Sequence, residues 1–163
     1  IWPLTLPARS VCTRRPGRAM VTAMTSPLDL DDRDALRDLA ARYALACDTR
    51  DFDALAHVFA PDAALRTGTS ERTGMAEILT AMQGLLRYEA TSHMVGQQVV
   101  DATSDGATGI TYCTAHHLTV EGDTRTDKVM HIRYHDRFVR TDGGWRIAAR
   151  RLEIVWTDER AVS

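Results

Sequence analysis

Long apolar runs are absent from this chain of 163 residues. No stretch approaches the roughly 20 apolar residues that a membrane-spanning helix needs. A basic stripe is absent as well, because the formal net charge is -2 and acidic and basic residues are interspersed. Proteins that bind phosphate backbones gather Lys and Arg on one face. We therefore expect no membrane partner and no nucleic acid partner.

Cysteine is scarce. The three cysteines, Cys12, Cys47 and Cys113, form no close pair and have no metal-type spacing. An odd count argues against a framework of disulfides. A reducing compartment is the simpler interpretation, and we expect a cytoplasmic protein that needs no metal or other cofactor.

The length of the chain and the character of its ends predict its organisation. A mass of 18.1 kDa fits one domain, which at this size buries about two-thirds of its unfolded surface. Residues 1–28 are basic, interrupted by proline and poor in periodic apolar positions, so we expect a disordered leader or tail. We expect Met20 or Met24 to be the natural start, with a cleaved targeting peptide as the alternative. We expect the domain to occupy residues 29–158, followed by a C-terminal tail over residues 159–163.

The first half of the domain has helical spacing. Apolar residues recur in steps of three and four over residues 36–47, which predicts a helix that Asp31 or Asp32 can cap. A shorter stripe follows over residues 52–59, and the same spacing returns over residues 74–86. These patterns predict three helices.

The second half has the period of β-strands. From Thr91 onward the apolar period is two, with turn signals at residues 104–106, 121–123 and 142–144. Four long strands joined by hairpins make an antiparallel meander. Helices first and strands second indicate an α+β domain in which the helices cover one face of a curved sheet.

Two residues stand where chemistry is plausible. Asp48 falls at the end of the first helix, and His93 falls near the start of the first long strand. A histidine held by a buried aspartate is a common general base, because imidazole titrates near neutrality and the carboxylate fixes its tautomer. Each residue also has a simpler interpretation, Asp48 as a helix cap and His93 as a hydrogen-bonded residue at a strand edge. The residues alone leave both interpretations open.

The order of several segments carries a family resemblance. These segments are YALACDTRDFD, FAPDA, SHM and a DGGWRI hairpin before the last strand. Over roughly residues 30–156 the chain resembles the SnoaL-like branch of the nuclear transport factor 2-like superfamily. The resemblance implies a cone-shaped fold, in which a strongly curved antiparallel sheet packs on three N-terminal helices around a deep pocket.

Within this branch the pattern is most similar to scytalone dehydratase, bile acid dehydratase and hexachlorocyclohexane dehydrochlorinase. These enzymes share an aspartate on the first helix and a histidine on a sheet strand, which match Asp48 and His93. Tyr43 precedes Asp48 by five residues, as a catalytic tyrosine does in the bile acid enzyme. The resemblance therefore implies catalytic roles for Asp48, His93 and Tyr43.

The later part of the resemblance is less complete. In the dehydrochlorinase, an arginine five residues after the hairpin tryptophan contributes to the site, and here that position after Trp145 is Arg150. The neighbouring Arg151 leaves the choice open. The bile acid enzyme has a catalytic aspartate where this chain has Ala115, which puts its full mechanism and its steroid substrate in doubt. His117 could compensate two residues further along the strand.

Strand alternation and the resemblance together predict a pocket wall. His131 and His135 share a face and, with His116, could be imagined as metal ligands. The resemblance leaves those histidines outside, so we expect no metal site. The expected pocket residues are Leu65, Met82, Leu86, Met94, Cys113, Ala115, His117, Met130, Ile132, Tyr134 and Trp156.

The expected function is a cofactor-independent lyase, a dehydratase or related elimination enzyme, acting on a small, largely apolar cyclic or polyketide-like molecule. His93 would take the proton, Asp48 would orient His93, Tyr43 would donate a hydrogen bond and Arg150 would hold developing negative charge. One alternative is an isomerase or cyclase that uses the same base. Another is a non-catalytic ligand-binding or assembly subunit, like the small subunit of a ring-hydroxylating dioxygenase. The resemblance also implies a homodimer or a homotrimer, and the sequence does not choose between them.

Overall fold

The computed structural model describes residues 27–162. The expected leader therefore lies almost wholly outside the described residues. Helix α1 spans Leu30–Thr49 and is capped by Asp29, whose side chain accepts a hydrogen bond from the backbone N–H of Asp32 at 2.8 Å. The cap, Asp29, thus precedes the two expected candidates, Asp31 and Asp32. Arg50 ends the helix in a left-handed conformation, with φ of 62°.

Short elements connect α1 to the long strands. The helix η1 spans Phe52–His57, the strands β1 and β2 span Phe59–Thr67 and Ser70–Thr73, and α2 and η2 span Met75–Met82 and Gln83–Arg87. Strand β2 was not expected, because its four residues are all exposed and give no apolar alternation. It forms a hairpin with β1.

The four long strands form the expected meander. They are β3 (Ala90–Thr103), β4 (Gly106–Glu121), β5 (Thr124–Thr141) and β6 (Gly144–Val162). The strand order in the sheet is β2-β1-β6-β5-β4-β3. Every neighbouring pair is antiparallel except β1 and β6, which are parallel. The sheet is therefore mixed rather than wholly antiparallel.

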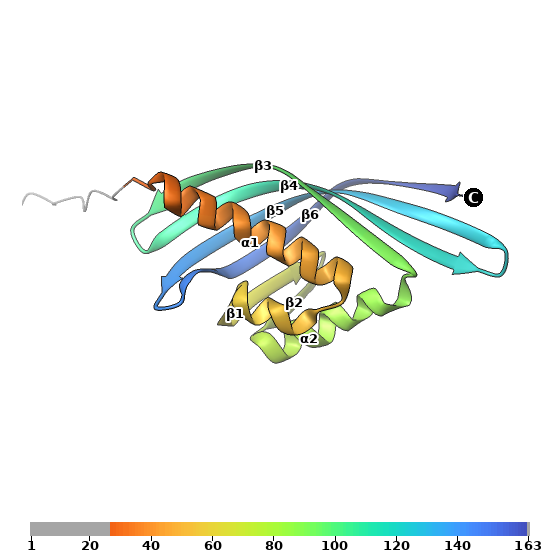
Figure 1. Ribbon diagram of the computed structural model, residues 1–163, viewed down its shortest axis with the longest axis horizontal. Coiled ribbons are helices and arrows are strands. Elements are labelled where there is room, and N and C mark those ends of the chain that lie inside the picture. The colour runs from red at the N-terminus through yellow and green to blue at the C-terminus, as the bar shows by residue number, and fades with distance from the viewer. Residues whose placement is uncertain (1–26, 163) are drawn as a thin grey trace, which may run out of the picture.

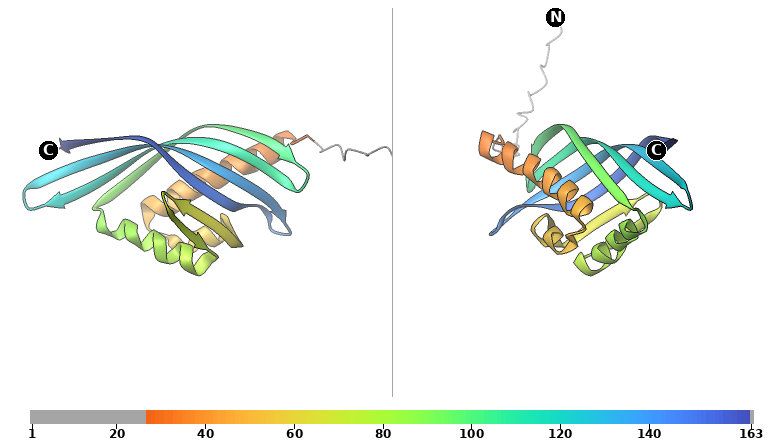
Figure 2. Two further views of the ribbon diagram at one scale, coloured as in Figure 1. Left: turned by 180° about the vertical axis from the view of Figure 1, so that it is seen from behind. Right: turned by 45° about the vertical axis from the view of Figure 1, so that its right-hand side comes forward.

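The helices cover one face of a strongly curved sheet, which confirms the α+β class (Figure 1, Figure 2). We call the covered side the inner face and the other the outer face. Strands β4, β5 and β6 extend beyond the helices, so the inner face is uncovered at that end (Figure 1). Residues 159–162 belong to β6 and pair with β5, so the expected C-terminal tail is wrong over these residues. No helix among residues 27–162 has the length and apolar character that crossing a membrane requires.

Two of the register shifts in the sheet set which side chains face inward on β3 and near Trp156. Register shifts fall between Val95 and Gln98 on β3, and between His131 and Ile132 on β5 opposite the segment 154–156 of β6. A bulge adds a residue to one strand and so reverses the inward and outward alternation beyond it. The second shift decides where Trp156 points.

Candidate active site

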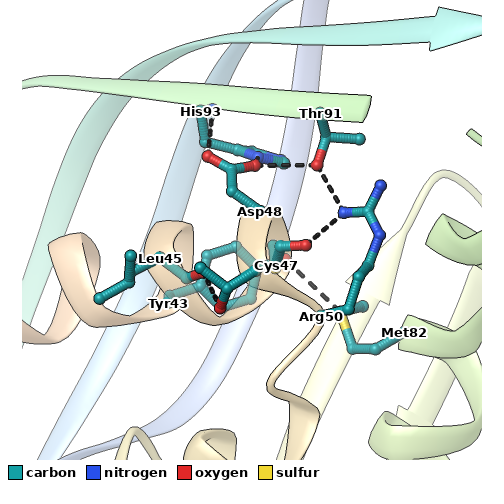
Figure 3. Close-up of polar contacts among 9 residues, drawn as sticks. Tyr43, Leu45, Cys47, Asp48, Arg50, Met82, Thr91 and His93 are labelled. Carbon is teal, nitrogen blue, oxygen red and sulfur yellow. Dashed lines mark hydrogen bonds and ion pairs between the residues drawn. The ribbon is translucent and has the colours of Figure 1, made fainter. Parts of the chain in front are cut away.

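Asp48 and His93 meet between the helical layer and the sheet. Nδ1 of His93 lies 2.7 Å from Oδ1 of Asp48, and the backbone N–H of His93 donates to Oδ2 at 2.8 Å (Figure 3). The carboxylate therefore holds both the backbone and the imidazole of His93. Because Asp48 occupies Nδ1, the neutral imidazole keeps its proton there and presents Nε2 as a proton acceptor.

Two further residues hold the carboxylate in place. The hydroxyl of Thr91 donates to Oδ1 of Asp48 at 2.9 Å, and Nη1 of Arg50 donates to the Thr91 hydroxyl at 2.6 Å (Figure 3). Arg50 also donates to the carbonyl oxygen of Cys47. The sequence analysis missed both residues. Thr91 could have been found, since it stands two residues before His93 and so shares its face of the strand.

The dyad is largely enclosed. The His93 side chain is 5% exposed and the Asp48 side chain 25%. No described residue hydrogen-bonds Nε2 of His93. The imidazole thus has one nitrogen fixed by Asp48 and one nitrogen without a hydrogen-bond partner among the described residues.

His117 is a second inward-facing histidine beside the dyad. Its ring centroid lies 5.6 Å from that of His93 and 4.7 Å from that of Tyr88. Burial lowers the pKa of His117 to about 4, and the nearby His93 acts in the same direction. His117 is therefore neutral near pH 7. Its Nδ1 is buried and has no hydrogen-bond partner among the described residues.

Tyr43 lies deeper, below the dyad. Its ring centroid is 6.5 Å from that of His93, and its hydroxyl is 4.0 Å from the sulfur of Met82 on α2 (Figure 3). Burial raises the pKa of Tyr43 well above its ordinary value, and the adjacent Cys47 adds to the effect. The phenol therefore keeps its proton and can only donate or accept hydrogen bonds.

The structure distinguishes Arg150 from Arg151. Arg150 faces inward and is 1% exposed, whereas Arg151 pairs with His135 on the outer face. Two nitrogens of Arg150 donate to the two carboxylate oxygens of Asp136, each at 2.8 Å. The guanidinium lies between two aromatic rings, 4.4 Å from the centroid of Tyr43 and 4.3 Å from that of Tyr134. Arg150 thus packs against the rings of both tyrosines.

Most of the expected pocket residues do face inward. Register places Cys113, Ala115 and His117 on the same face as their β5 partners Ile132, Met130 and Lys128. Tyr134 also faces inward and is buried. Leu65 and Met82 are buried as well.

Three of the expected pocket residues do not face the interior. Met94 is 66% exposed on the outer face, since it follows inward-facing His93 directly, and Leu86 is 61% exposed on η2. Trp156 is 53% exposed and stacks on His131 at 4.0 Å, also on the outer face. If side chains alternated regularly along β6 from inward-facing Arg150, Trp156 would face inward. The bulge near Val155 reverses the alternation, so Trp156 faces outward.

Neither Asp48 nor His93 lines any of four hollows described on residues 27–162. One hollow, of about 680 Å³, lies on the sheet around Asp101, Ile110 and Arg151, and another, of about 590 Å³, lies between α1 and the β5–β6 hairpin. None of the four is therefore the deep pocket that was expected beside the dyad.

The outer histidines are engaged by carboxylates. His116 contacts Asp127 at 2.9 Å, and His135 contacts Glu153 at 2.6 Å. Among the described residues, no group of three histidine, cysteine, aspartate or glutamate side chains is placed to hold a metal ion.

A curved mixed sheet, covered on one face by helices that bring an aspartate to a strand histidine, defines an α+β protein of the nuclear transport factor 2-like superfamily. A model of the SnoaL-like domain matches residues 28–151. The uncharacterized protein Rv2910c of Mycobacterium tuberculosis is 31% identical over 133 residues, which cover 78% of this chain and 88% of that protein. The chain belongs to the SnoaL-like domain family.

Several solved structures share the fold. The protein Kfla4162 of Kribbella flavida has a TM-score of 0.73 at 25% identity and covers 78% of this chain and 93% of its own. A protein of Novosphingobium aromaticivorans, provisionally named a scytalone dehydratase, has a TM-score of 0.73 at 22% identity, with coverages of 82% and 91%. A hexachlorocyclohexane dehydrochlorinase, LinA type 2, has a TM-score of 0.70 at 22% identity, with coverages of 82% and 90%.

Proposed function

We propose that this protein is a cofactor-independent lyase, a dehydratase or related elimination enzyme, for a small and largely apolar cyclic or polyketide-like molecule. The observation that carries the proposal is the 2.7 Å contact between Nδ1 of His93 and Asp48. The names dehydratase and dehydrochlorinase, borne by two proteins of the same fold, both describe eliminations. They support the same class of reaction here.

In the proposed reaction, Nε2 of His93 removes a proton from a carbon next to an electron-withdrawing group. The carbon–hydrogen electron pair forms a double bond as the neighbouring carbon–oxygen bond breaks. The imidazolium then returns its proton to the departing hydroxyl, so that water leaves. Asp48 stabilises the imidazolium and fixes the ring, an arrangement that contributes on the order of a hundredfold to ten-thousandfold in rate.

Tyr43 and Arg150 have supporting roles in this proposal. Tyr43 keeps its proton and can donate a hydrogen bond to a carbonyl or to the departing group. Arg150 is already neutralised by Asp136 and lies against the ring of Tyr43. We therefore assign Arg150 to positioning Tyr43 rather than to contact with the substrate.

An isomerase or cyclase would use the same first step, since it too begins with proton removal, and only the product separates it from an elimination. A non-catalytic subunit would not need the dyad. The hydrogen bonds that Thr91 and the His93 backbone give to Asp48 hold the dyad in one geometry. This arrangement favours a base over a merely structural contact.

The test compares His93→Ala and Asp48→Asn with the parent protein on a panel of cyclic β-hydroxy ketones, following formation of the conjugated enone by absorbance. We expect loss of nearly all turnover in His93→Ala and a large loss in Asp48→Asn. His135→Ala removes an outer histidine and serves as the matched control. Near-normal turnover by His93→Ala, on a compound that the parent protein converts, contradicts the proposal.

The outer sheet face supports a further part of the proposal, association of identical chains in a homodimer or homotrimer. Large side chains exposed there include Val99 at 62% and Tyr112 at 47%, besides Met94 and Trp156. Cys47 and Cys113 are free and buried, which supports a reducing, cytoplasmic location.

A further inference from the structure

Positive charge gathers beside the dyad on the inner face. Lys128 is the only lysine of the chain, and it stands directly opposite His117 on the neighbouring strand, so both side chains face inward. The guanidinium carbon of Arg87 lies 4.8 Å from the ring centroid of Tyr88, which in turn contacts His117. Among the described residues, neither Lys128 nor Arg87 forms an ion pair.

His117 supplies an independent sign of a ligand. The residue is 5% exposed, and its buried Nδ1 has no hydrogen-bond partner among the described residues. Buried polar atoms are nearly always paired, and one left unpaired costs free energy. The unpaired nitrogen, on the strand face that also carries Lys128 and next to the ring of Tyr88 that Arg87 contacts, fits an incoming acceptor that carries negative charge.

The carboxylates nearby do not neutralise this group. Asp48 is engaged by His93 and Thr91. Glu159 stands opposite Lys128 on β6, but it is exposed and makes no ion pair with Lys128 among the described contacts. The excess charge at His117 is therefore positive.

We propose that the molecule bound beside the dyad carries a carboxylate, held at Nδ1 of His117 between Lys128 and Arg87. The inference rests on the proposed function and adds the class of substrate: a largely apolar acid rather than a neutral compound. The neutral imidazole of His117 donates one N–H to the carboxylate, and the two cations supply charge-assisted hydrogen bonds.

The spacing of the two histidines constrains such a molecule. Their ring centroids are 5.6 Å apart, so one small molecule can contact both imidazoles at once. Met130 and Ile154 line the same face near the uncovered end, and Ile154 is 51% exposed. They offer an apolar wall to the rest of the molecule.

The test uses a matched pair of probes, cyclohexanecarboxylate and the neutral cyclohexanecarboxamide, with binding measured by calorimetry. We expect the carboxylate to bind the parent protein about tenfold or more tightly than the amide. Lys128→Gln and Arg87→Gln should each weaken carboxylate binding about tenfold and leave amide binding unchanged. Lys128→Arg keeps the charge and should restore most of the affinity.

Arg151→Gln is the control, because it removes the same charge from the outer face. It should leave both affinities unchanged. Equal binding of the two probes, failure of both to bind, or equal weakening by Arg151→Gln and Lys128→Gln would each overturn the inference.

A spectroscopic measurement gives a second readout. The pKa of His117, about 4 in the free protein, should rise when cyclohexanecarboxylate is bound, because a nearby negative charge favours the protonated imidazole. Cyclohexanecarboxamide should leave the pKa of His117 unchanged, and an unchanged value with the saturating carboxylate rejects the assignment. His93→Ala should keep the carboxylate preference while losing turnover. Turnover that depends on His93 without any carboxylate preference would reject this inference alone.

Discussion

At the scale of single residues, the site is built from partners that constrain one another. Asp48 receives three hydrogen bonds, from Nδ1 of His93, from the backbone of His93 and from Thr91. Further inside, Arg150 and Asp136 form a fully buried ion pair between two tyrosines. Such groups stabilise the fold only when every partner is present, because removing one partner leaves the other buried and unpaired.

The buried ion pair gives the first residue-scale prediction. Asp136→Asn removes the charge that compensates Arg150 in the interior, so we expect the free energy of unfolding to fall by about 3 kcal/mol or more. Urea unfolding followed by circular dichroism measures the change. Arg42→Gln breaks an exposed ion pair with Asp38 and should leave the unfolding midpoint almost unchanged. Equal midpoints for Asp136→Asn and the parent protein would contradict this account.

His117 gives a prediction about pH. In the unfolded chain this histidine takes up a proton near its ordinary pKa of 6.5, whereas burial in the folded protein lowers that pKa to about 4. Between these values the unfolded chain binds more protons, so stability should fall as the pH is lowered from about 6.5 to about 4.

The His117→Gln variant isolates this contribution. Its stability should depend less steeply on pH in that window. Asp127, whose pKa is held below its ordinary value of 3.8 by His116 and Arg160 against the opposing effect of burial, loses its stabilising effect mainly below this window, so it does not mask the contribution of His117. Identical slopes in the variant and the parent protein would show that His117 titrates normally when folded.

At the scale of elements, hairpins and bulges decide which side chains reach the site. The period-two pattern predicted the four long strands and their turns, and the helical spacing predicted α1 and its end near Asp48. The bulge opposite Ile132 left no apolar signal, so the inward placement of Trp156 was wrong. Strand β2 was not predicted for a related reason, because its exposed residues show no alternation of apolar and polar side chains.

The β3–β4 hairpin offers a prediction at this scale. A Cβ atom added to Gly106 would lie 2.1 Å from the carbonyl oxygen of Phe138, which belongs to the backbone of β5 and cannot rotate away. We expect Gly106→Ala to destabilise the fold by about 1–3 kcal/mol, as overpacked sites do. Gly84→Ala, where nothing lies within 4 Å, is the matched control. Thermal unfolding that ranks the two variants equally would contradict this packing.

At the scale of the whole molecule, the sheet has one face that carries the candidate site and one exposed face. The inner face carries the dyad and the cations, and the outer face carries exposed apolar side chains. How much of the site the sequence predicted depended on whether the signal was local along the chain. The helix end at Asp48 and the strand start at His93 were local signals, but it was the family resemblance that joined the two residues into a dyad. Arg50 and Lys128 were missed because their neighbours Thr91 and His117 lie on other elements.

The exposed outer face predicts self-association. Tyr112→Asp places a charge in the middle of the exposed apolar side chains, so we expect it to convert an oligomer into a monomer in sedimentation velocity. Leu45→Asp, on an exposed position of α1 that is 63% accessible, should leave the sedimentation coefficient unchanged. A parent protein that sediments as a monomer, or the same coefficient for Tyr112→Asp and the parent, would refute this use of the outer face.

The central claim is that His93, held by Asp48, removes a proton from carbon. The most direct measurement is the rate at which the protein opens the ring of 5-nitrobenzisoxazole, because this reaction needs only a base and releases an absorbing phenolate without further help from the site. We predict that the parent protein accelerates ring opening on the order of a hundredfold or more over His93→Ala. Equal rates for the two proteins would contradict the account.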